Sequence, residues 1–352
     1  MQVAQISDIH IDYYATRLGA MKLENGINIY HKERIELFAS MVKTVIASHC
    51  EVLVISGDLF NKSKPTPQEY ADVMSILDSV SAASILVLII PGNHDEITSR
   101  GCALQPFIGR RPLIRVALVP TIIPCQGLNF LLVPWGVPFS EVQQLRKQIQ
   151  YNNCILVYHT GVMNGTLNWG ETADEAATCT LKELESLDCD AVMLGHYHGQ
   201  GPLDKANKIW YAGSPECFNF GEEGQTKGFL IWNFEQGHLS GVERRHLLNT
   251  VIYQTITPDQ VQTGYSFPGY LRIKGDVSEV ERARIIKTMK TVECAGYKLE
   301  LMSSSKAQRI VQVSGRTNKE ILGNYFSSKK IAATQIYFDV DDEIEKELSN
   351  EL

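Results

Sequence analysis

Seven side chains that can bind a metal ion follow five apolar stretches of the sequence. They are Asp8, His10, Asp58, Asn93, His159, His196 and His198. Carboxylate, amide and imidazole groups with no thiolate nearby in the sequence suit Mn²⁺, Fe²⁺ or Zn²⁺ better than Ca²⁺ or a soft metal. One carboxylate can bridge two cations about 3.5–4 Å apart, and such a pair activates water and holds the oxygens of a phosphate ester. The pattern therefore predicts a dinuclear metal site.

The stretch "ILVLIIPGNHDEI" adds a second kind of candidate residue. A turn after an apolar strand explains Gly92 and Asn93, but it does not explain the pair His94 and Asp95. Any one of these motifs taken alone is more often structural than functional. Because five of them recur at the ends of apolar strands, we interpret them as one site in which Asn93 binds metal and His94 faces the substrate.

Apolar strands alternate with helical stretches from the first residue to about residue 200. The strands are expected near 3–7, 51–56, 84–90, 154–158 and 191–194, and the helices near 31–48, 66–80, 139–149 and 181–187. Near-continuous apolar strands between helices indicate a sheet covered on both faces. Ligands of such sheets lie outside the carboxyl ends of the strands, so we expect all seven side chains at one edge of one sheet.

The second half of the chain has a different organisation. Hairpins follow residue 205, with a turn expected at Gln236 and Gly237, and the polar passage 250–268 indicates a boundary. Strand-like stretches at 269–275, 297–303 and 309–315 surround a charged helix at 278–293, which together predict a small α/β module. The acidic end, 339–352, is expected to form a helix or a mobile tail.

Composition excludes several classes of protein. A content of 44% hydrophobic and 21% charged residues is ordinary for a soluble globular chain. No apolar run reaches the roughly 18 residues of a transmembrane helix, and the start "MQVAQISDIH" lacks the features of a secretory signal. The eight cysteines are scattered singly, which favours buried thiols in a cytoplasmic protein. A net charge of −7 opposes a uniform electrostatic attraction to nucleic acid, although a local basic groove remains possible.

Taken in order, the motifs Asp-x-His, Gly-Asp, Gly-Asn-His-Asp, His and Gly-His-x-His resemble the calcineurin-like metallophosphoesterase superfamily. "GDLFNKSKPTPQ" and "WYAGSPECFNFGEEGQTKGFLIW" are similar to segments of the SbcD-type DNA repair nucleases within it. The resemblance covers about residues 1–315. It implies an α/β layered metallophosphoesterase fold with two β-sheets flanked by helices, and a smaller C-terminal α/β capping domain. The expected domains are a nuclease domain at 1–248, a DNA-capping domain at 249–315 and a C-terminal segment at 316–352.

The resemblance also implies roles for the side chains. One metal ion would be held by Asp8, His10, Asp58 and His198. The other would be held by Asp58, Asn93, His159 and His196, with Asp58 as the bridge. His94 would stabilise the transition state or protonate the leaving oxygen, and Asp95 would orient His94. The metal of the family is usually Mn²⁺, with Mg²⁺ as the alternative.

As activity, the resemblance implies a DNA nuclease that is both a duplex exonuclease and a single-strand endonuclease. It would act in DNA end processing, recombination, repair or replication, in the cytoplasm near the nucleoid or, for a phage protein, in that of the host. Its partner would be an SMC-like ATPase bound through 316–352. Homodimers would form through helices near 66–80 and 101–111, where Met74, Leu77 and Leu104 could equally belong to the core.

Candidate contacts to DNA phosphates are Asn61, Lys62, Lys64, Arg110 and Arg111, although short charge runs are more often solvated surface. Asn61 stands where some family members carry a histidine linked to exonuclease action, so the balance between the two nuclease activities is open. The same metal centre could serve a phosphomonoesterase or a cyclic-nucleotide phosphodiesterase. A metal-stabilised scaffold without activity is less consistent with a complete donor set.

Overall fold

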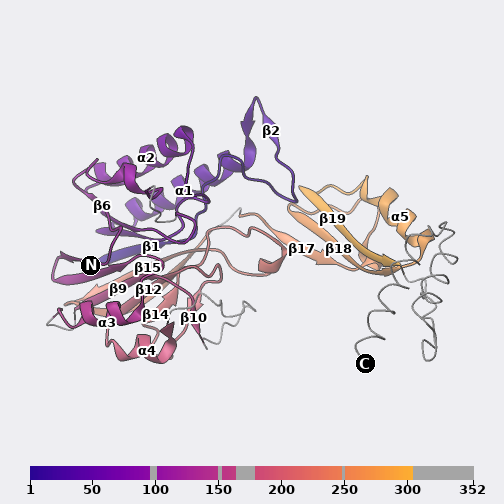
Figure 1. Ribbon diagram of the computed structural model, residues 1–352. Helices are drawn as coiled ribbons and strands as arrows, with labels where there is room; N and C mark the ends of the chain where they lie inside the picture. The colour runs from indigo at the N-terminus through magenta and orange to yellow at the C-terminus, as the bar shows by residue number, and fades with distance from the viewer. Residues whose placement is uncertain (96–100, 150–152, 164–178, 248–249, 304–352) are drawn as a thin grey trace, which may run out of the picture. The chain divides into compact units, whose positions relative to one another are not determined.

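The computed structural model describes residues 1–95, 101–149, 153–163, 179–247 and 250–303 (Figure 1). The chain divides into two compact units. The first comprises Met1–Lys274 and Ile286–Glu300, and it contains every predicted site residue. Within the second unit, residues 275–285 and 301–303 are described.

The first large sheet carries the amino-terminal strands. Its order is β16 (His238–His246), β15 (Gly228–Glu235), β1 (Gln2–Ile6), β4 (Val52–Ser56), β5 (Leu86–Ile90) and β6 (Ile114–Val116). Strands β1, β4, β5 and β6 are parallel, and β15 is antiparallel to β1. The β15–β16 hairpin turns at Gln236 and Gly237, whose φ values of 51° and 86° fit the expected turn.

The second large sheet is built from the middle of the chain. Its order is β13 (Gly201–Pro202), β14 (Ile209–Tyr211), β12 (Ala191–Gly195), β9 (Cys154–His159), β8 (Leu128–Val133) and β7 (Thr121–Cys125). Strands β14, β12, β9 and β8 are parallel. The edge strands β13 and β7 are antiparallel to their neighbours.

Alternate residues of each strand face different layers. Along β4, Leu53 and Ile55 belong to a core cluster shared with helices α1 (Ile29–Ala47) and α2 (Pro67–Ala82). Val52 and Val54 belong to a second cluster. Since side chains alternate across a strand, one face of the first sheet packs on helices and the other face packs on the second sheet.

The second sheet repeats the arrangement. Its strands contribute Phe130 and Ile155 to the cluster between the sheets. They contribute Leu131 and Leu156 to a third cluster that includes side chains of α3 (Phe139–Arg146) and α4 (Leu181–Ser186). The layers therefore run helix, sheet, sheet, helix.

The capping-box motif begins two of these helices. In α2 the side chain of Thr66 accepts from the backbone of Glu69 while the carboxylate of Glu69 accepts from the backbone N of Thr66. In α4, Thr180 and Glu183 make the same pair of hydrogen bonds. Each pair satisfies two backbone groups that a helix start would otherwise leave unpaired.

Smaller elements complete the described chain. They are β2 (Leu23–Glu24), β3 (Ile27–Asn28), β10 (Val162–Met163), β11 (Cys179–Thr180), and the 3₁₀ turns η1 (Gln105–Phe107), η2 (Phe220–Glu222) and η3 (Pro258–Gln260). A three-stranded sheet has the order β17 (Tyr253–Ile256), β18 (Tyr270–Val277) and β19 (Gly296–Ser303), and α5 (Glu279–Met289) lies between β18 and β19 in the sequence.

The predicted fold class is confirmed: two sheets are flanked by helices. The interpretation that all donor strands belong to one sheet is wrong, because β1, β4 and β5 lie in the first sheet and β9 and β12 in the second. A strand that packs between a helix layer and another sheet is buried on both faces, like a strand between two helix layers. The hydrophobic pattern is the same in both cases.

One local prediction also needs correction, and one element was not predicted. The region 101–111 was expected to be helical, and the structure has only the short 3₁₀ turn η1 there. The passage 250–268, predicted as a boundary, also contains the short strand β17, which the sequence pattern did not show. Tyr253 and Ile256 are buried there and the two residues between them are half-buried. Four residues are too few for a period of two to be recognised.

Other expectations fit the structure or lie outside its described part. Leu77 and Leu104 are fully buried in the first core cluster and Met74 packs against it, as the core interpretation held. All eight cysteines lie in the described ranges, and none forms a disulfide. No helix among the described residues is long and apolar enough to cross a membrane. The strand at 309–315 and the segment 316–352 lie outside the described residues, and the domain boundaries stay a prediction.

Candidate metal centre

The loops that follow β1 and β4 are hydrogen-bonded to each other along their backbones. The backbone N of Asp8 donates to the carbonyl of Gly57 at 3.1 Å, and that of His10 donates to the carbonyl of Asp58 at 3.0 Å. Asp8, His10 and Asp58 have φ values of 52°, 51° and 50°. Non-glycine residues rarely adopt this left-handed conformation, and a cluster of them in adjoining loops agrees with a functional site.

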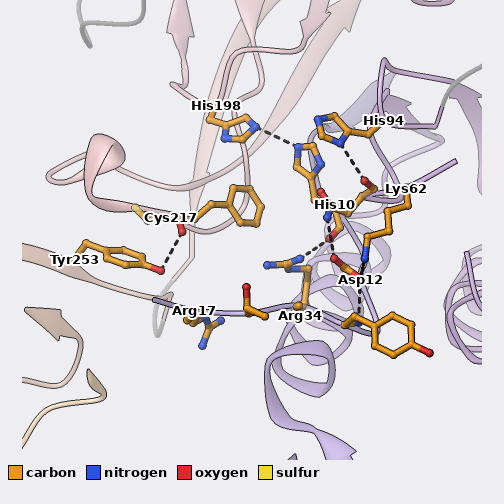
Figure 2. A pocket seen from close by; sticks show the side chains of 14 residues that line it. His10, Asp12, Arg17, Arg34, Lys62, His94, His198, Cys217 and Tyr253 are labelled. Carbon is orange, nitrogen blue, oxygen red and sulfur yellow. Dashed lines mark hydrogen bonds and ion pairs between the residues drawn. The ribbon is translucent and has the colours of Figure 1, made fainter. Parts of the chain in front are cut away.

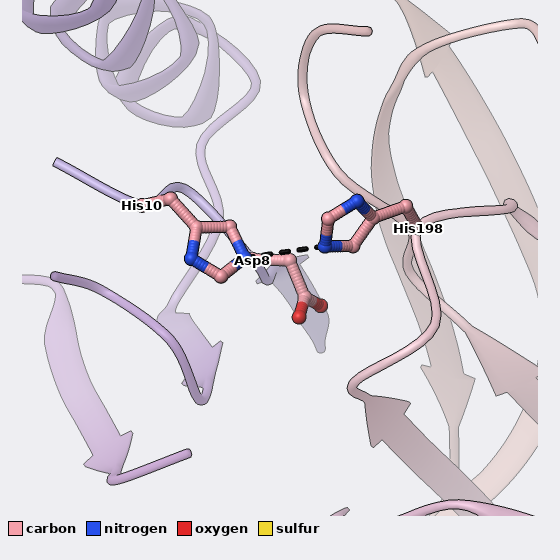
Figure 3. Close-up of side chains that lie close together, drawn as sticks. All are labelled: Asp8, His10 and His198. Carbon is pink, nitrogen blue, oxygen red and sulfur yellow. Dashed lines mark hydrogen bonds between the residues drawn. The ribbon is translucent and has the colours of Figure 1, made fainter. Parts of the chain in front are cut away.

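One group of donors contains Asp8, His10 and His198 (Figure 3). The Nε2 atoms of His10 and His198 face each other at 3.2 Å. Oδ2 of Asp8 accepts from the backbone N of His196 at 3.1 Å. Oδ1 of Asp8 is buried and has no hydrogen-bond partner among the described residues, so it is available to a cation.

A second group surrounds Asn93. Its Oδ1 lies 3.1 Å from Nε2 of His159 and 3.1 Å from Nδ1 of His196. Nδ1 of His159 donates to the carbonyl of Ser56 at 2.8 Å, which leaves the lone pair of Nε2 directed at Asn93. Nε2 of His159 is therefore the ring nitrogen that would bind a metal ion.

Asp58 lies between the two groups. Its Oδ2 is 3.7 Å from Nε2 of His10 and 3.6 Å from Nε2 of His159. Its Oδ1 accepts from the backbone N of His94 at 2.9 Å. A bridging carboxylate needs this intermediate position.

The chemistry of the donor set fits two divalent cations. Burial raises the pKa of Asp8 and raises that of Asp58 to about 6, since both carboxylates have lost water. Burial likewise lowers the pKa values of His10 and His159, which favours the neutral imidazoles that metal ions bind. An unpartnered buried carboxylate oxygen such as Oδ1 of Asp8 is costly in a protein interior, and a bound cation would satisfy it.

Glycines make room for the donors. A Cβ atom on Gly92 would lie 2.1 Å from Oδ1 of Asp58. A Cβ atom on Gly57, whose φ is +105°, would lie 2.0 Å from Nδ1 of His159. Only glycine fits at these positions without displacing a donor.

An aromatic ring packs against each histidine group. The Phe218 ring centroid is 5.3 Å from that of His10 and 5.1 Å from that of His198. The Trp135 ring centroid is 4.8 Å from that of His196. These contacts restrict the orientations of the imidazoles.

His94 is the exposed histidine of the cluster. Its Nδ1 lies 3.0 Å from the carbonyl of Asn61, to which it can donate, and this tautomer leaves Nε2 for another partner. Its ring packs edge-on against that of His10 at 4.6 Å between centroids. His94 is therefore positioned to meet a substrate beside the donors.

The prediction that Asp95 orients His94 is corrected by the geometry. The Asp95 carboxylate accepts three backbone hydrogen bonds, at 3.2, 2.9 and 3.1 Å, from Leu59, Phe60 and Gly92. Burial raises the pKa of this carboxyl to about 8. Asp95 thus joins the loops after β4 and β5, and the carbonyl of Asn61 takes the orienting role.

A cavity of about 410 Å³ adjoins the cluster (Figure 2). The histidines that line it are His10, His94 and His198. Two of the predicted DNA contacts, Asn61 and Lys62, line it too, and both donate to the carboxylate of Asp12, at 2.8 and 3.0 Å. The side chain of Asn61 is thus directed at Asp12.

The other predicted DNA contacts are not brought to this cavity. Lys64 lines a different pocket. Arg111 makes a two-pronged ion pair with Asp78, at 2.9 and 2.8 Å, and Nε of Arg110 donates to the carbonyl of Pro106 at 3.1 Å.

Several charged residues around the centre were not predicted to have a role. Arg34 donates to the carbonyl of His10 at 2.5 Å and to Glu216 at 2.7 Å, and Arg17 donates to Glu216 at 2.9 Å. Glu222 and Lys227 form a further buried pair. Sequence spacing does not identify a buried charge, although Glu216, Glu222 and Lys227 belong to the passage whose resemblance to nucleases was noted.

Comparison with known proteins agrees with the metal-site motifs. The family model "Calcineurin-like phosphoesterase" matches residues 1–200. The curated protein SbcD, a component of the nuclease SbcCD of Staphylococcus epidermidis, is 26% identical over an alignment of 214 residues that covers 54% of this chain and 57% of that protein. The chain thus matches somewhat more than half the length of this relative.

Three solved structures are also similar. A dimetal phosphatase from Danio rerio has 11% identity and a TM-score of 0.43, over 67% of this chain and 93% of its own. Purple acid phosphatase PPD1 from yellow lupin has 13% identity and a TM-score of 0.40, over 66% of this chain and 48% of its own. Pseudomonas putida nuclease MPE has 20% identity and a TM-score of 0.26, over 47% of this chain and 66% of its own. Scores this low carry no information about function.

The family match covers more than half of the 352 residues, and the chain therefore belongs to the calcineurin-like phosphoesterase family of metal-dependent hydrolases.

Proposed function

We propose that this chain is a dinuclear-metal-dependent nuclease that hydrolyses phosphodiester bonds in DNA. The observation that carries the proposal is the convergence of seven side chains that can bind metal, two of which, His10 and His198, line the same cavity as His94. The choice of DNA is supported by the relative whose name is that of a nuclease component.

We assign the donors to the two sets that the resemblance implies, and the distances between their atoms support this assignment. The first set is Asp8, His10, Asp58 and His198, and the second is Asp58, Asn93, His159 and His196. The expected ions are Mn²⁺, with Mg²⁺ as the alternative. When bound, such a pair supplies Lewis acidity that activates water and offsets charge on the phosphate oxygens.

His94 and Lys62 supply groups that contact the substrate directly, a role that the metal donors do not have. With its Nδ1 held by the carbonyl of Asn61, His94 can donate from Nε2 to a phosphate oxygen or protonate the leaving oxygen. The side chain of Lys62 is 54% exposed and lines the cavity, where its ammonium can contact a neighbouring phosphate. Asp12 holds that ammonium in place and accepts from Asn61 as well.

The larger assembly is part of the proposal. Residues 1–248 form the nuclease domain, 249–315 the DNA-capping domain and 316–352 the segment that binds an SMC-like ATPase. The relative is named as one component of SbcCD, which supports a partner chain. Homodimer contacts are proposed near 66–80 and 101–111. Because Leu77 and Leu104 are buried in the chain's own core, other side chains of these regions would form that interface.

The test uses the purified chain with end-labelled duplex and single-stranded DNA, in Mn²⁺, Mg²⁺ or chelator. We expect cleavage only with metal. His94→Ser should retain both ions and lose about 10²–10⁴-fold in rate, the typical contribution of a positioned acid. Asp58→Asn should lose both activity and metal affinity, because the bridge between the two ions loses its charge.

Three results would redirect the proposal. If the chain hydrolysed a chromogenic phosphomonoester and left DNA uncleaved, the phosphomonoesterase alternative would be favoured. Turnover of a cyclic nucleotide alone would favour the cyclic-nucleotide phosphodiesterase. Loss of metal from His94→Ser would make His94 a ligand.

A further inference from the structure

A buried carboxylate contacts the back of one candidate ligand. Oε1 of Glu222 lies 2.9 Å from Nδ1 of His198, and Glu222 is 4% exposed. Nδ1–H can donate to this carboxylate, which leaves the lone pair of Nε2 on the opposite side of the ring. On that side lies Nε2 of His10, at 3.2 Å. Carboxylates that accept from a metal-binding histidine fix its tautomer and its direction.

A buried lysine holds this carboxylate in place. Nζ of Lys227 donates to Oε2 of Glu222 at 2.6 Å and to the carbonyl of His198 at 3.0 Å. It also lies 2.9 Å from Oγ of Ser214 and 2.9 Å from Oε1 of Gln225. Lys227 is 3% exposed, so its charge depends on these oxygens for solvation. The lysine therefore fixes both the carboxylate and the backbone of the same histidine.

A structural role alone does not account for this arrangement. Replacing a buried ion pair by apolar groups of similar volume is often neutral or stabilising, because burying two charges is costly. Here both charged groups contact His198, one through its ring and the other through its carbonyl. The contacts converge on a candidate ligand.

We propose that Glu222 and Lys227 are positioning residues that hold His198 ready to bind metal. The inference rests on the proposed metal centre and deepens it. It assigns a role to the passage "GSPECFNFGEEGQTKG", whose resemblance to nucleases carries no assigned chemistry.

The test separates positioning from stability with two variants and a control. Glu222→Gln keeps the volume and one acceptor oxygen but leaves the Lys227 ammonium without its ion pair. The double variant Glu222→Gln/Lys227→Met removes both charges. Glu223→Gln is the matched control, because Glu223 is exposed and accepts from the backbone N of Thr255 at 2.7 Å. For each protein, Mn²⁺ is titrated by calorimetry and the Tm of the metal-free form is measured.

We expect both variants to weaken one of the two Mn²⁺ binding steps by about 10–100-fold, the usual effect of removing such a partner. Glu222→Gln should also lower the metal-free Tm, because it leaves a buried charge unpaired. The double variant should recover that Tm without recovering Mn²⁺ affinity. The control should match the wild type in both measurements.

Other outcomes identify which idea fails. If the double variant binds two Mn²⁺ ions with wild-type affinities, Glu222 and Lys227 have only a structural role and the inference is overturned, while the proposed centre stands. If Mn²⁺ affinity recovers together with the Tm, the inference is overturned in the same way. If the wild-type chain itself does not bind two Mn²⁺ ions, the proposed metal centre fails first and the inference fails with it.

Discussion

Gly92→Ala tests whether the position of Asp58 controls the metal centre. A Cβ atom at residue 92 would lie 2.1 Å from Oδ1, 2.7 Å from Cγ and 2.6 Å from the backbone N of Asp58. To reach the 3.4 Å of ordinary contact, Oδ1 must move by about 1.3 Å. Rotation of the side chain alone cannot relieve the contact with the backbone. The substitution therefore displaces Asp58 while every donor keeps its chemical type.

The displacement has two expected costs. Excess volume in a packed interior typically costs about 1–3 kcal/mol of unfolding free energy, measured by urea denaturation of the metal-free protein. Oδ1 would also leave the backbone N of His94, and Oδ2 would leave its place between His10 and His159. Because a misplacement of about 1 Å at a reacting centre can cost about 10²-fold in rate, we expect DNA cleavage to fall by at least that factor and Mn²⁺ affinity to fall with it.

Gly241→Ala is the matched control for this experiment. It makes the same substitution in strand β16, where the added Cβ meets no atom within 4 Å. We expect wild-type Mn²⁺ binding and cleavage from it. If Gly92→Ala bound two Mn²⁺ ions and cleaved DNA as the control does, the position of Asp58 would not limit activity, and its assignment as the bridge would be refuted.

Two further predictions concern stability. Glu216→Gln should lower the unfolding free energy by about 3–5 kcal/mol, because it removes the shared partner of the buried Arg17 and Arg34; a loss below about 1 kcal/mol in urea denaturation would contradict this. Free Mn²⁺ at about one hundred times the Kd of a site should raise the unfolding free energy by about 2.7 kcal/mol for each site that it fills, since the ions bind only the folded chain. A chelator should reverse that gain, and an equal gain in Asp58→Asn would show that the ions bind elsewhere.

The identity of the donors could be predicted from the sequence because each follows an apolar strand. A strand's carboxyl end is visible in sequence, as in "CILVY" before His159, and ligands lie at such ends. Which sheet each strand joins is not visible in the same way. Val52 and Leu53 are equally apolar, although one faces the second sheet and the other faces the helices.

The residues that support the donors could not be predicted for a different reason. Arg34 lies within α1, and its partner Glu216 is 182 positions away in the sequence. Nothing in the local pattern separates a buried, paired arginine from an exposed one. Likewise, Asp95 follows His94 directly, which favoured a role on that ring, whereas two of its three backbone partners, Leu59 and Phe60, follow β4.

Backbone pairing couples metal binding to the placement of His94. After Asp8 and His10, the backbone N of Ile11 donates to the carbonyl of Leu59 at 2.9 Å, and that of Asn61 donates to the carbonyl of Ile11 at 2.9 Å. The carbonyl of Asn61 then accepts from the His94 ring. One continuous ladder therefore runs from two donors to the exposed histidine. The backbone of Asn61, which any residue at that position retains, orients His94, while its side chain donates to Asp12.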